Sequence, residues 1–237
     1  MAAVTDFERL QAAPVLETVR RLEGRIAARF PERGLRRVAA ELVALTAQVT
    51  KDAPDIQQRV RRVRTWSRVA AGLILVATVV AVTLGLQDAV GDGTERELDW
   101  LFLIETTIND LVFAAIALFF LYGVPERVQR GHTLDLLHRL RSLAHIVDMH
   151  QLTKDPERLN PSFRETAMSP HPDLDRDQLE YYLDYCSELL SLVAKTAALC
   201  AEESRDAIVL DTVSRIEQLT TSLSRNIWQK ISVLPSA

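Results

Sequence analysis

The sequence lacks the short motifs by which most enzymes and nucleotide-binding proteins are recognised. It contains no G-x-G-x-x-G or G-x-x-x-x-G-K-[ST] phosphate loop, no G-x-S-x-G elbow, no H-E-x-x-H and no C-x-x-C. It also lacks a long run of like charges, and the net charge is only -4, so the electrostatic signature of a nucleic-acid-binding protein is missing. These absences favour a non-enzymatic protein with no cofactor, no metal and no nucleic-acid partner.

Glycine and cysteine are also scarce. The chain has 8 glycines, and its prolines fall singly between long apolar-periodic runs, which favours helix throughout. The two cysteines, Cys186 and Cys200, lie in one helical pattern, which places them about 21 Å apart at about 1.5 Å rise per residue. A disulfide needs Cα atoms within about 7 Å, so we expect free thiols. The opening stretch MAAVTDFERL does not resemble a signal peptide.

Two long apolar runs stand out instead. The first, from Val69 to Leu86, contains no charged residue, and about 18 such residues make a transmembrane candidate. The second extends from Trp100 to Tyr122, and Trp66 precedes the first; aromatic residues are typical of membrane interfaces. The alternative is a buried helix of a soluble protein. We predict an all-α membrane protein in which residues 65–123 form a two-helix transmembrane hairpin, with spans at about 66–87 and 100–123.

The charges around these runs are asymmetric. The link 88–99 is acidic, with Asp88, Asp92, Glu95, Glu97 and Asp99 against Arg96 alone. The opposite flanks are basic, with Arg59, Arg61, Arg62, Arg64 and Arg68 before the first run and Arg127 and Arg130 after the second. By the positive-inside rule, the link faces outward and both termini are cytoplasmic. Arginine far outnumbers lysine, as in proteins of GC-rich bacteria, so the predicted location is a bacterial inner (plasma) membrane.

The second run carries polar groups near its start, namely Glu105, Asn109 and Asp110. If Arg68 and Val124 mark the inner face, Asp110 lies about 6 Å inside the outer face; if the span starts at Trp100, it lies about 15 Å deep. A carboxylate at the bilayer centre costs about 2.5–3.5 kcal/mol and should face protein or water. Two interpretations remain open: a carboxylate ring for cations or protons in an oligomer, or interfacial groups that orient the hairpin and bond neighbouring helices.

The first run carries small residues at every fourth position, which are Ala77, Ala81 and Gly85. Such a stripe allows close contact between membrane helices. Thr78 and Thr83 are expected to offer hydroxyl groups to a neighbouring helix.

Outside the hairpin, the sequence has the 3-4 spacing of helix bundles and coiled coils. In the N-terminal arm, residues 1–64, two helices separated by FPERG carry the stripes Val15, Val19, Leu22, Ile26, Phe30 and Leu35, Val38, Leu42, Leu45, Val49. A further helix is expected to start at Asp52 and Pro54 and to run into the membrane. These arms are expected to be cytoplasmic.

The C-terminal part, residues 124–237, is predicted to be a cytoplasmic helical bundle. It has a helix from Pro125 to about Met149, a proline-rich irregular loop at 151–174, and two long helices joined by the polar turn AEESRD. The short turn predicts antiparallel packing of these two helices, the first of which starts near Asp175. The predicted apolar faces comprise Leu134, Leu137, Leu140, Ala144, Val147; Leu179, Tyr182, Cys186, Leu189, Val193, Cys200; and Val209, Val213, Ile216, Thr220, Leu223, Ile227. Whether the arms pair within one chain or between chains is left open.

The segment from His138 to Arg158 has the densest cluster of reactive side chains. His138, Arg141, His145 and Asp148 share one helical face, and His150, Lys154 and Asp155 follow at the helix end. No known metal-site spacing is reproduced. The alternatives are a polar face that bonds the following loop, with Asp155 capping a turn at Pro156, or a regulatory patch that senses pH or binds a small anion.

The layout of a helical arm, two membrane helices and an acidic link resembles the mitochondrial calcium uniporter family. That family has a Trp-Asp-x-x-Glu-Pro signature at its outer mouth. The nearest segment here is DWLFLIETTIND, from Asp99 to Asp110, in which the Trp-Asp order is reversed and the proline is missing. The resemblance is one of layout, and no family is assigned.

The leading functional prediction is a self-associating inner-membrane protein whose cytoplasmic helices scaffold an oligomer or bind a protein partner. The alternative is an oligomeric cation or proton channel with Glu105, Asn109 and Asp110 at its mouth. A third hypothesis is a membrane-tethered enzyme or a metal or pH sensor that uses His138, His145 and Asp148.

Overall fold

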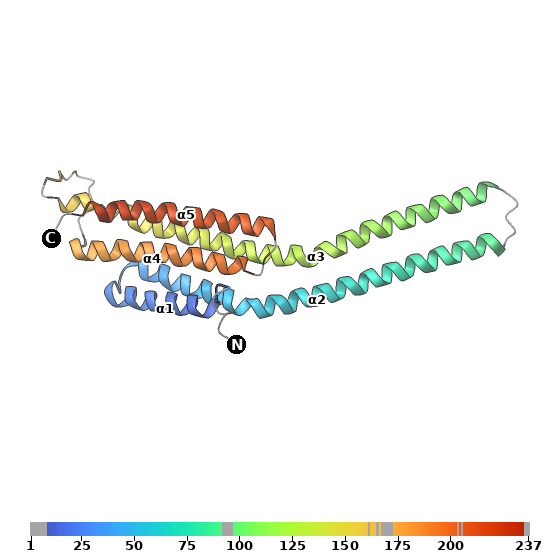
Figure 1. Ribbon diagram of the computed structural model, residues 1–237, viewed down its shortest axis with the longest axis horizontal. Coiled ribbons are helices and arrows are strands. Elements are labelled where there is room, and N and C mark those ends of the chain that lie inside the picture. Colours follow the sequence, from blue (N-terminus) through green and yellow to red (C-terminus); the bar gives the residue numbers. More distant parts are fainter. Residues whose placement is uncertain are drawn as a thin grey trace. The chain divides into compact units, whose positions relative to one another are not determined.

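In a computed structural model, the chain is all-helical, as predicted (Figure 1). The structure describes residues 9–91, 97–160, 162–164, 166, 173–202, 204 and 206–234, and it has no strand within them. The helices are α1 (Ala12–Arg29), α2 (Gly34–Gly91), α3 (Glu97–Leu152), the short 3-10 helix η2 (Pro156–Leu159), α4 (Arg176–Ala201) and α5 (Ala207–Ser232). The middle of the acidic link, residues 92–96 with Asp92, Glu95 and Arg96, and the loop prolines Pro161, Pro170 and Pro172 lie outside the described residues.

The chain divides into two compact units. The helical unit consists of Met1–Ala53 and His132–Ala237, and the apolar unit consists of Pro54–Gly131. Helices α2 and α3 each contribute to both units, because each continues through the boundary. The two arms that the sequence pattern leaves separate therefore lie in one unit and share one hydrophobic core.

The predicted apolar stripes are buried in the core of the helical unit. Leu22, Ile26, Leu42, Leu140 and Ile216 are all less than 3% exposed, and the remaining stripe residues lie in the core or pack against it, save for Thr220, a buried polar residue. The stripes thus pair within a single chain. Because burial of a Leu or Ile side chain is worth about 1.5–3 kcal/mol, these stripes supply most of the driving force for folding the unit.

Helix α4 lies at the centre of this core. It packs against both α1 and α5, and its buried residues include a second row that the predicted stripe omits: Leu183, Tyr185, Leu190, Leu192, Thr196 and Ala197. A helix with one apolar face rests on the surface of a bundle, whereas a helix buried on most of its circumference is internal. The prediction that α4 and α5 pack together is confirmed.

One polar contact crosses this core. The hydroxyl oxygens of Thr46 on α2 and Thr196 on α4 are 3.0 Å apart, and both residues are fully buried. Each hydroxyl also lies 2.8 Å from a carbonyl oxygen of its own helix, that of Leu42 or Leu192. With these carbonyls available, the pair is satisfied without water, so it costs little in an otherwise apolar layer.

The helix ends in the helical unit follow local sequence signals. Asp175 caps α4 in a full capping box with Gln178, and Asp206 caps α5 through the amides of Ile208 and Val209. Asp155 caps η2, which begins at Pro156, as one interpretation of this segment predicts. The start near Asp175 is confirmed.

One predicted helix boundary is wrong. No new helix starts at Asp52 and Pro54, because α2 is continuous from Gly34 to Gly91. The stretch from Pro125 to Met149 is helical, as predicted, and forms part of α3, which continues through Pro125. A proline inside a helix removes one hydrogen bond and clashes with the preceding turn. Long helical stretches on both sides retain their own hydrogen bonds, so a single proline bends a helix more often than it ends one.

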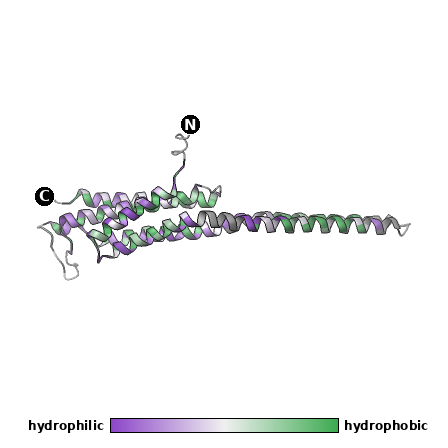
Figure 2. Cartoon of the chain, turned by 90° about the horizontal axis from the view of Figure 1, so that it is seen from below, coloured by the Kyte–Doolittle hydropathy of each residue, from purple (hydrophilic) through white to green (hydrophobic). Residues whose placement is uncertain are grey.

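The apolar unit is different in character. Figure 2 shows a continuous apolar stretch along its helices, and both helices are long and apolar enough to cross a membrane. None of the residues in either apolar window is buried; Leu73 is 66% exposed, Phe113 70% and Phe119 75%. A buried core helix, the alternative in the sequence analysis, does not fit these spans in the single chain.

The central position of α4 generates a stability prediction. Replacing Leu190, in the row outside the predicted stripe, with alanine should lower the free energy of unfolding by about 2–5 kcal/mol, as much as Leu189→Ala, because both side chains are fully buried. Thermal unfolding of the full chain in detergent, followed by circular dichroism, measures both effects. Ser191→Ala, at an exposed site on α4, should change the stability by less than about 0.5 kcal/mol. A near-neutral Leu190→Ala would contradict an internal α4.

Candidate functional site

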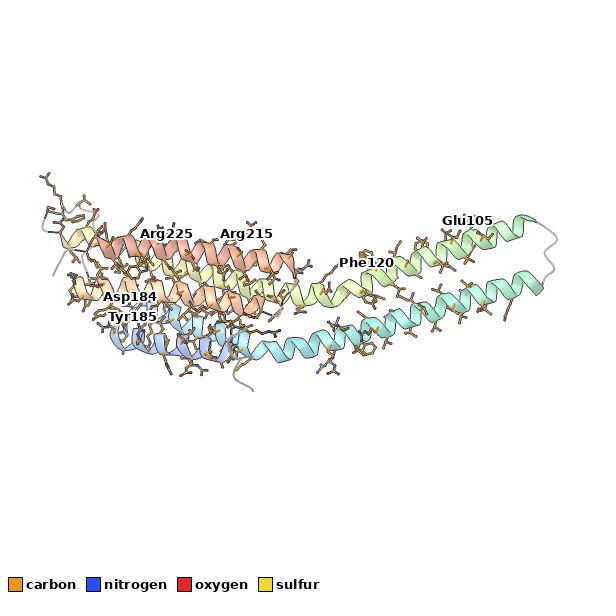
Figure 3. The ribbon with its side chains drawn as sticks, in the orientation of Figure 1. Glu105, Phe120, Asp184, Tyr185, Arg215 and Arg225 are labelled. Atoms are coloured by element: carbon orange, nitrogen blue, oxygen red, sulfur yellow. The ribbon has the colours of Figure 1, made fainter. Side chains whose placement is uncertain are left out.

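The three polar residues singled out on the second span lie on the outside of the apolar unit. Glu105, Asn109 and Asp110 are exposed, and Figure 3 labels Glu105. On the same helix, the less exposed positions are Thr107, Ala114, Ala117, Leu118 and Leu121. The chain itself therefore leaves the three polar side chains uncovered, although each can form hydrogen bonds and two carry charge.

The small-residue stripe of the first span is only partly used within the chain. Ala77 and Ala81 are exposed and Gly85 is less so, whereas the more covered side of α2 carries Ala71, Ile74, Thr78 and Val82. The hydroxyl of Thr78 donates to the Ile74 carbonyl at 2.9 Å, and that of Thr83 donates to the Val80 carbonyl at 2.9 Å. Both hydroxyl groups thus donate within their own helix, and their oxygen atoms keep acceptor capacity; contact with a neighbouring helix stays a prediction.

The histidine-rich segment divides into two parts. His138, Arg141 and His145 are exposed on the surface of α3, as their shared face predicts. Asp148 accepts a 2.6 Å hydrogen bond from Nε2 of Gln151, one turn further along. His150, Lys154 and Asp155 are partly buried at the end of the helical unit, among residues from other helices.

At this end, four segments of the chain meet in a polar junction. Asp173 accepts hydrogen bonds from Arg33, in the α1–α2 turn, and from Lys154, whose Nζ lies 2.9 Å from its Oδ1. Lys230 on α5 donates to the carbonyl oxygens of Gln151 and Lys154 at 2.9 and 3.1 Å. A lysine at a helix C-terminus satisfies carbonyls that lack partners in the helix and opposes the negative end of its dipole.

His150 lies against the start of α2 in this junction. Its Nδ1 is 3.5 Å from the hydroxyl of Tyr182, and its ring fills the space beside Gly34. Tyr182 is 2% exposed and packs edge-on against Phe30, with ring centroids 5.4 Å apart. The junction therefore continues directly into the apolar core.

The charges and pKa shifts in the junction favour contacts that hold its segments together. Burial raises the pKa of Asp173, but the hydrogen bonds and charges of Arg33 and Lys154 outweigh it and bring this pKa to about 2. Burial lowers the pKa of His150, and the charges of Arg37 and Lys154 lower it further. Burial also raises the pKa of Tyr182 and lowers that of Lys230. At pH 7 Asp173 therefore stays charged, paired with Arg33 and Lys154, and His150 is neutral.

Several residues of the junction escaped the sequence analysis. Arg33, Asp173 and Lys230 come from three distant parts of the chain, and no motif or spacing connects them. Gln151 was also missed; it is 2% exposed, and its Oε1 has no hydrogen-bond partner in the described part of the structure. Tyr182 was predicted as a core residue, which it is, but its contact with His150 was not.

Among the described residues, no group of three or more His, Cys, Asp or Glu side chains could hold a metal ion. Cys186 and Cys200 are free thiols on α4, as expected. Burial raises the pKa of both, that of Cys200 to about 12. A buried thiol with a raised pKa is a poor nucleophile.

Comparisons with protein-family models, with curated proteins and with solved structures found no match to this chain. The exposure, charges and side-chain contacts within each of the two units are therefore the basis for a functional proposal.

The contact between Gly34 and His150 generates a double-mutant prediction. A Cβ at residue 34 would lie 2.4 Å from Cε1 of His150, so Gly34→Ala should displace the ring and cost about 1–3 kcal/mol of unfolding free energy. In a His150→Ala background the space is open, and the same change should be neutral or stabilising by about 0.4–1 kcal/mol. Thermal unfolding of the four proteins measures the coupling. Equal effects in both backgrounds would show that the ring does not pack on Gly34.

The lowered pKa of His150 generates a pH prediction. The unfolded chain protonates this histidine near its ordinary pKa of 6.5, at a higher pH than the folded chain does. The folded state therefore loses stability as the pH falls through that value. Stability stops falling once the pH is below the lowered pKa that His150 has in the folded chain. His150→Gln should flatten the slope of unfolding free energy between pH 7.5 and 6, by chemical denaturation. His145→Gln, at an exposed site on α3, is the matched control; an unchanged slope in His150→Gln would refute this assignment.

Proposed function

We propose that the chain is a non-enzymatic, self-associating inner-membrane protein. Its apolar unit is a transmembrane hairpin, and its helical unit is a cytoplasmic scaffold for an oligomer or a protein partner. The single observation that carries this proposal is the exposure of both apolar spans: side chains such as Leu73, Phe113 and Phe119 have no protein cover. Apolar surface on this scale is stable only against lipid or another protein.

The orientation follows from charge. Arg61, Arg62, Arg64 and Arg68 lead into the first span, and Arg127 and Arg130 follow the second. Arginine and lysine are enriched on the cytoplasmic side of membrane helices. Trp66 is 74% exposed and Tyr122 is 76% exposed; these values suit aromatic residues that sit at the membrane interface. This distribution of charges and aromatic residues supports a cytoplasmic helical unit.

Self-association is supported by the carboxylates and small residues that the single hairpin leaves exposed. Asp110 and Glu105 are exposed on the second span, and an ionisable group within a membrane normally faces protein or water. Ala77 and Ala81 are exposed on the first span, where small residues allow helices to approach closely. A second copy of the chain would cover both features, since it presents the same groups.

A partner of the helical unit would have to bind its outer surface, because the predicted apolar stripes are buried within the single chain. Leu42, Leu45, Val213 and Ile216 are buried in the core of the single chain, so they are unavailable to a partner. The unit also exposes large apolar side chains: Ile146, Met149 and Leu152 on α3 and Trp228 on α5, which are 45%, 66%, 57% and 57% exposed. Exposed apolar side chains of this kind are typical of protein-binding surfaces.

The second candidate is an oligomeric channel for cations or protons. The exposed Glu105 and Asp110 favour it, since rings of carboxylates line the mouths of cation channels. One hairpin cannot enclose a water path, so this candidate requires a ring of several copies.

The proposal predicts that the nanodisc-embedded protein contains two or more copies. Ala77→Leu with Ala81→Leu should reduce the particle to a monomer, because larger side chains hold the helix backbones apart. The matched control is Val76→Leu with Val80→Leu, one residue along the same exposed side at the same depth; it should leave the mass unchanged. Mass photometry or native mass spectrometry measures the copy number.

A monomeric wild-type particle would overturn self-association and the channel together. Release of the chain from membranes by alkaline carbonate would overturn membrane insertion. If a ring of four or more copies is found, ion flux in liposomes separates the two candidates. A channel predicts that Glu105→Gln or Asp110→Asn alters flux at constant mass, whereas a scaffold predicts that neither changes any flux; Asp135→Asn, on the exposed surface of the helical unit, is the control.

A further inference from the structure

A cavity of about 260 Å³ lies within the apolar unit, at the end where the arginine-rich segment meets the first span. Its lining comes from both helices: Arg64, Ser67, Arg68 and Ala71 from α2 and Leu121, Tyr122 and Glu126 from α3. The cavity thus places Arg68 and Tyr122 at one level along the two helices. The proposed function does not use it.

The lining divides into a polar part and an apolar part along the helices. Arg64, Ser67 and Glu126 lie on the side of the basic flanks, and Ala71 and Leu121 belong to the apolar spans. Arg68 and Tyr122 stand between them. A site with a charged end and an apolar end matches a molecule with a polar headgroup and a hydrocarbon chain, rather than a free ion.

The two arginines are available to a ligand. Neither Arg64 nor Arg68 forms an ion pair within the described part of the chain, although Glu126 lines the same cavity. By contrast, the guanidinium of Arg127 lies 5.8 Å from the ring centroid of Phe120, a residue labelled in Figure 3. Guanidinium groups bind phosphate oxygens through paired hydrogen bonds, and the hydroxyl of Ser67 adds a further donor.

The net charge of the cavity lining indicates which kind of phospholipid headgroup fits it. Two arginines against one glutamate leave a single positive charge in the cavity. A singly anionic phospholipid balances this charge, whereas a zwitterionic one does not. The carboxylate of Glu126 accepts hydrogen bonds but repels a second phosphate, which favours a headgroup with free hydroxyl groups.

We propose that this cavity binds the headgroup of a singly anionic, hydroxyl-bearing phospholipid of the cytoplasmic leaflet. The phosphate lies between Arg64 and Arg68, a headgroup hydroxyl donates to Glu126, and the acyl chains leave along Ala71 and Leu121. Basic cavities between membrane helices on the cytoplasmic side are suited to anionic headgroups. This inference rests on the proposed membrane placement of the apolar unit.

The test is native mass spectrometry of the full chain, purified from membranes and equilibrated with equal amounts of phosphatidylglycerol and phosphatidylethanolamine. The wild type should retain phosphatidylglycerol in preference, by about tenfold. Arg64→Gln with Arg68→Gln should reduce this retention by at least about tenfold, because it removes both guanidinium groups that hold the phosphate. Arg61→Gln with Arg62→Gln removes the same charge from exposed sites outside the cavity and should change retention less than about twofold.

Three results would overturn the inference. Equal losses in the two arginine pairs would mean a diffuse basic surface without a site. A preference for phosphatidylethanolamine, weakened by Glu126→Gln, would mean that the carboxylate binds an ammonium group. Displacement of the lipid by millimolar inorganic phosphate would mean a free-anion site.

Failure of the proposed function gives different results. A chain that is not inserted would be extracted by alkaline carbonate and would carry no lipid in any variant. A chain that is inserted but monomeric would fail the mass test and could still retain phosphatidylglycerol. Unchanged circular dichroism and thermal unfolding of the arginine variants show that a lost lipid does not reflect a lost fold.

Discussion

The burial of α4 between helices from both halves of the chain is the interaction on which the helical unit depends. Its side chains contact α1, from the N-terminal part, and α5, from the C-terminal end, and Thr196 reaches Thr46 on α2. Helix α4 thus covers part of the apolar stripes from both ends of the chain, within one shared core. The two arms fold together because one helix needs cover on most of its circumference and the others each need cover on one face.

The same hydrophobic effect has two different outcomes along α2 and α3. In the helical unit these helices bury stripes such as Leu35 to Leu45 and Leu137 to Val147. In the apolar unit they carry apolar side chains on all sides, and these remain exposed. Two helices can cover only one face of each other, so the rest of their apolar surface must meet another medium. The exposed spans, with arginines at one end and carboxylates towards the other, are consistent with a bilayer as that medium.

The charged side chains of the two units have different surroundings. At one end of the helical unit, Arg33, Lys154 and Lys230 neutralise Asp173 and the carbonyls at the end of α3. These contacts hold segments of the helical unit together. In the apolar unit, by contrast, Arg64 and Arg68 line a cavity, and neither forms an ion pair among the described residues. The proposed lipid headgroup would supply their partner.

The sequence alone determined the helical class, the core stripes, the apolar spans and the caps at Asp155 and Asp175, because each follows from periodicity or from contacts within a few residues. It did not determine that α2 and α3 run unbroken through Pro54 and Pro125, since the cost of a proline depends on the helix around it. Only the tertiary structure decided that the stripes pair within one chain, that Leu190 and Leu183 form a second buried row, that Thr46 meets Thr196, and that Arg33, Lys154 and Asp173 converge. It also decided which residues line the cavity between the spans. These contacts join residues far apart in sequence, and their free energy depends on which helix faces share a core, a property that no local pattern contains.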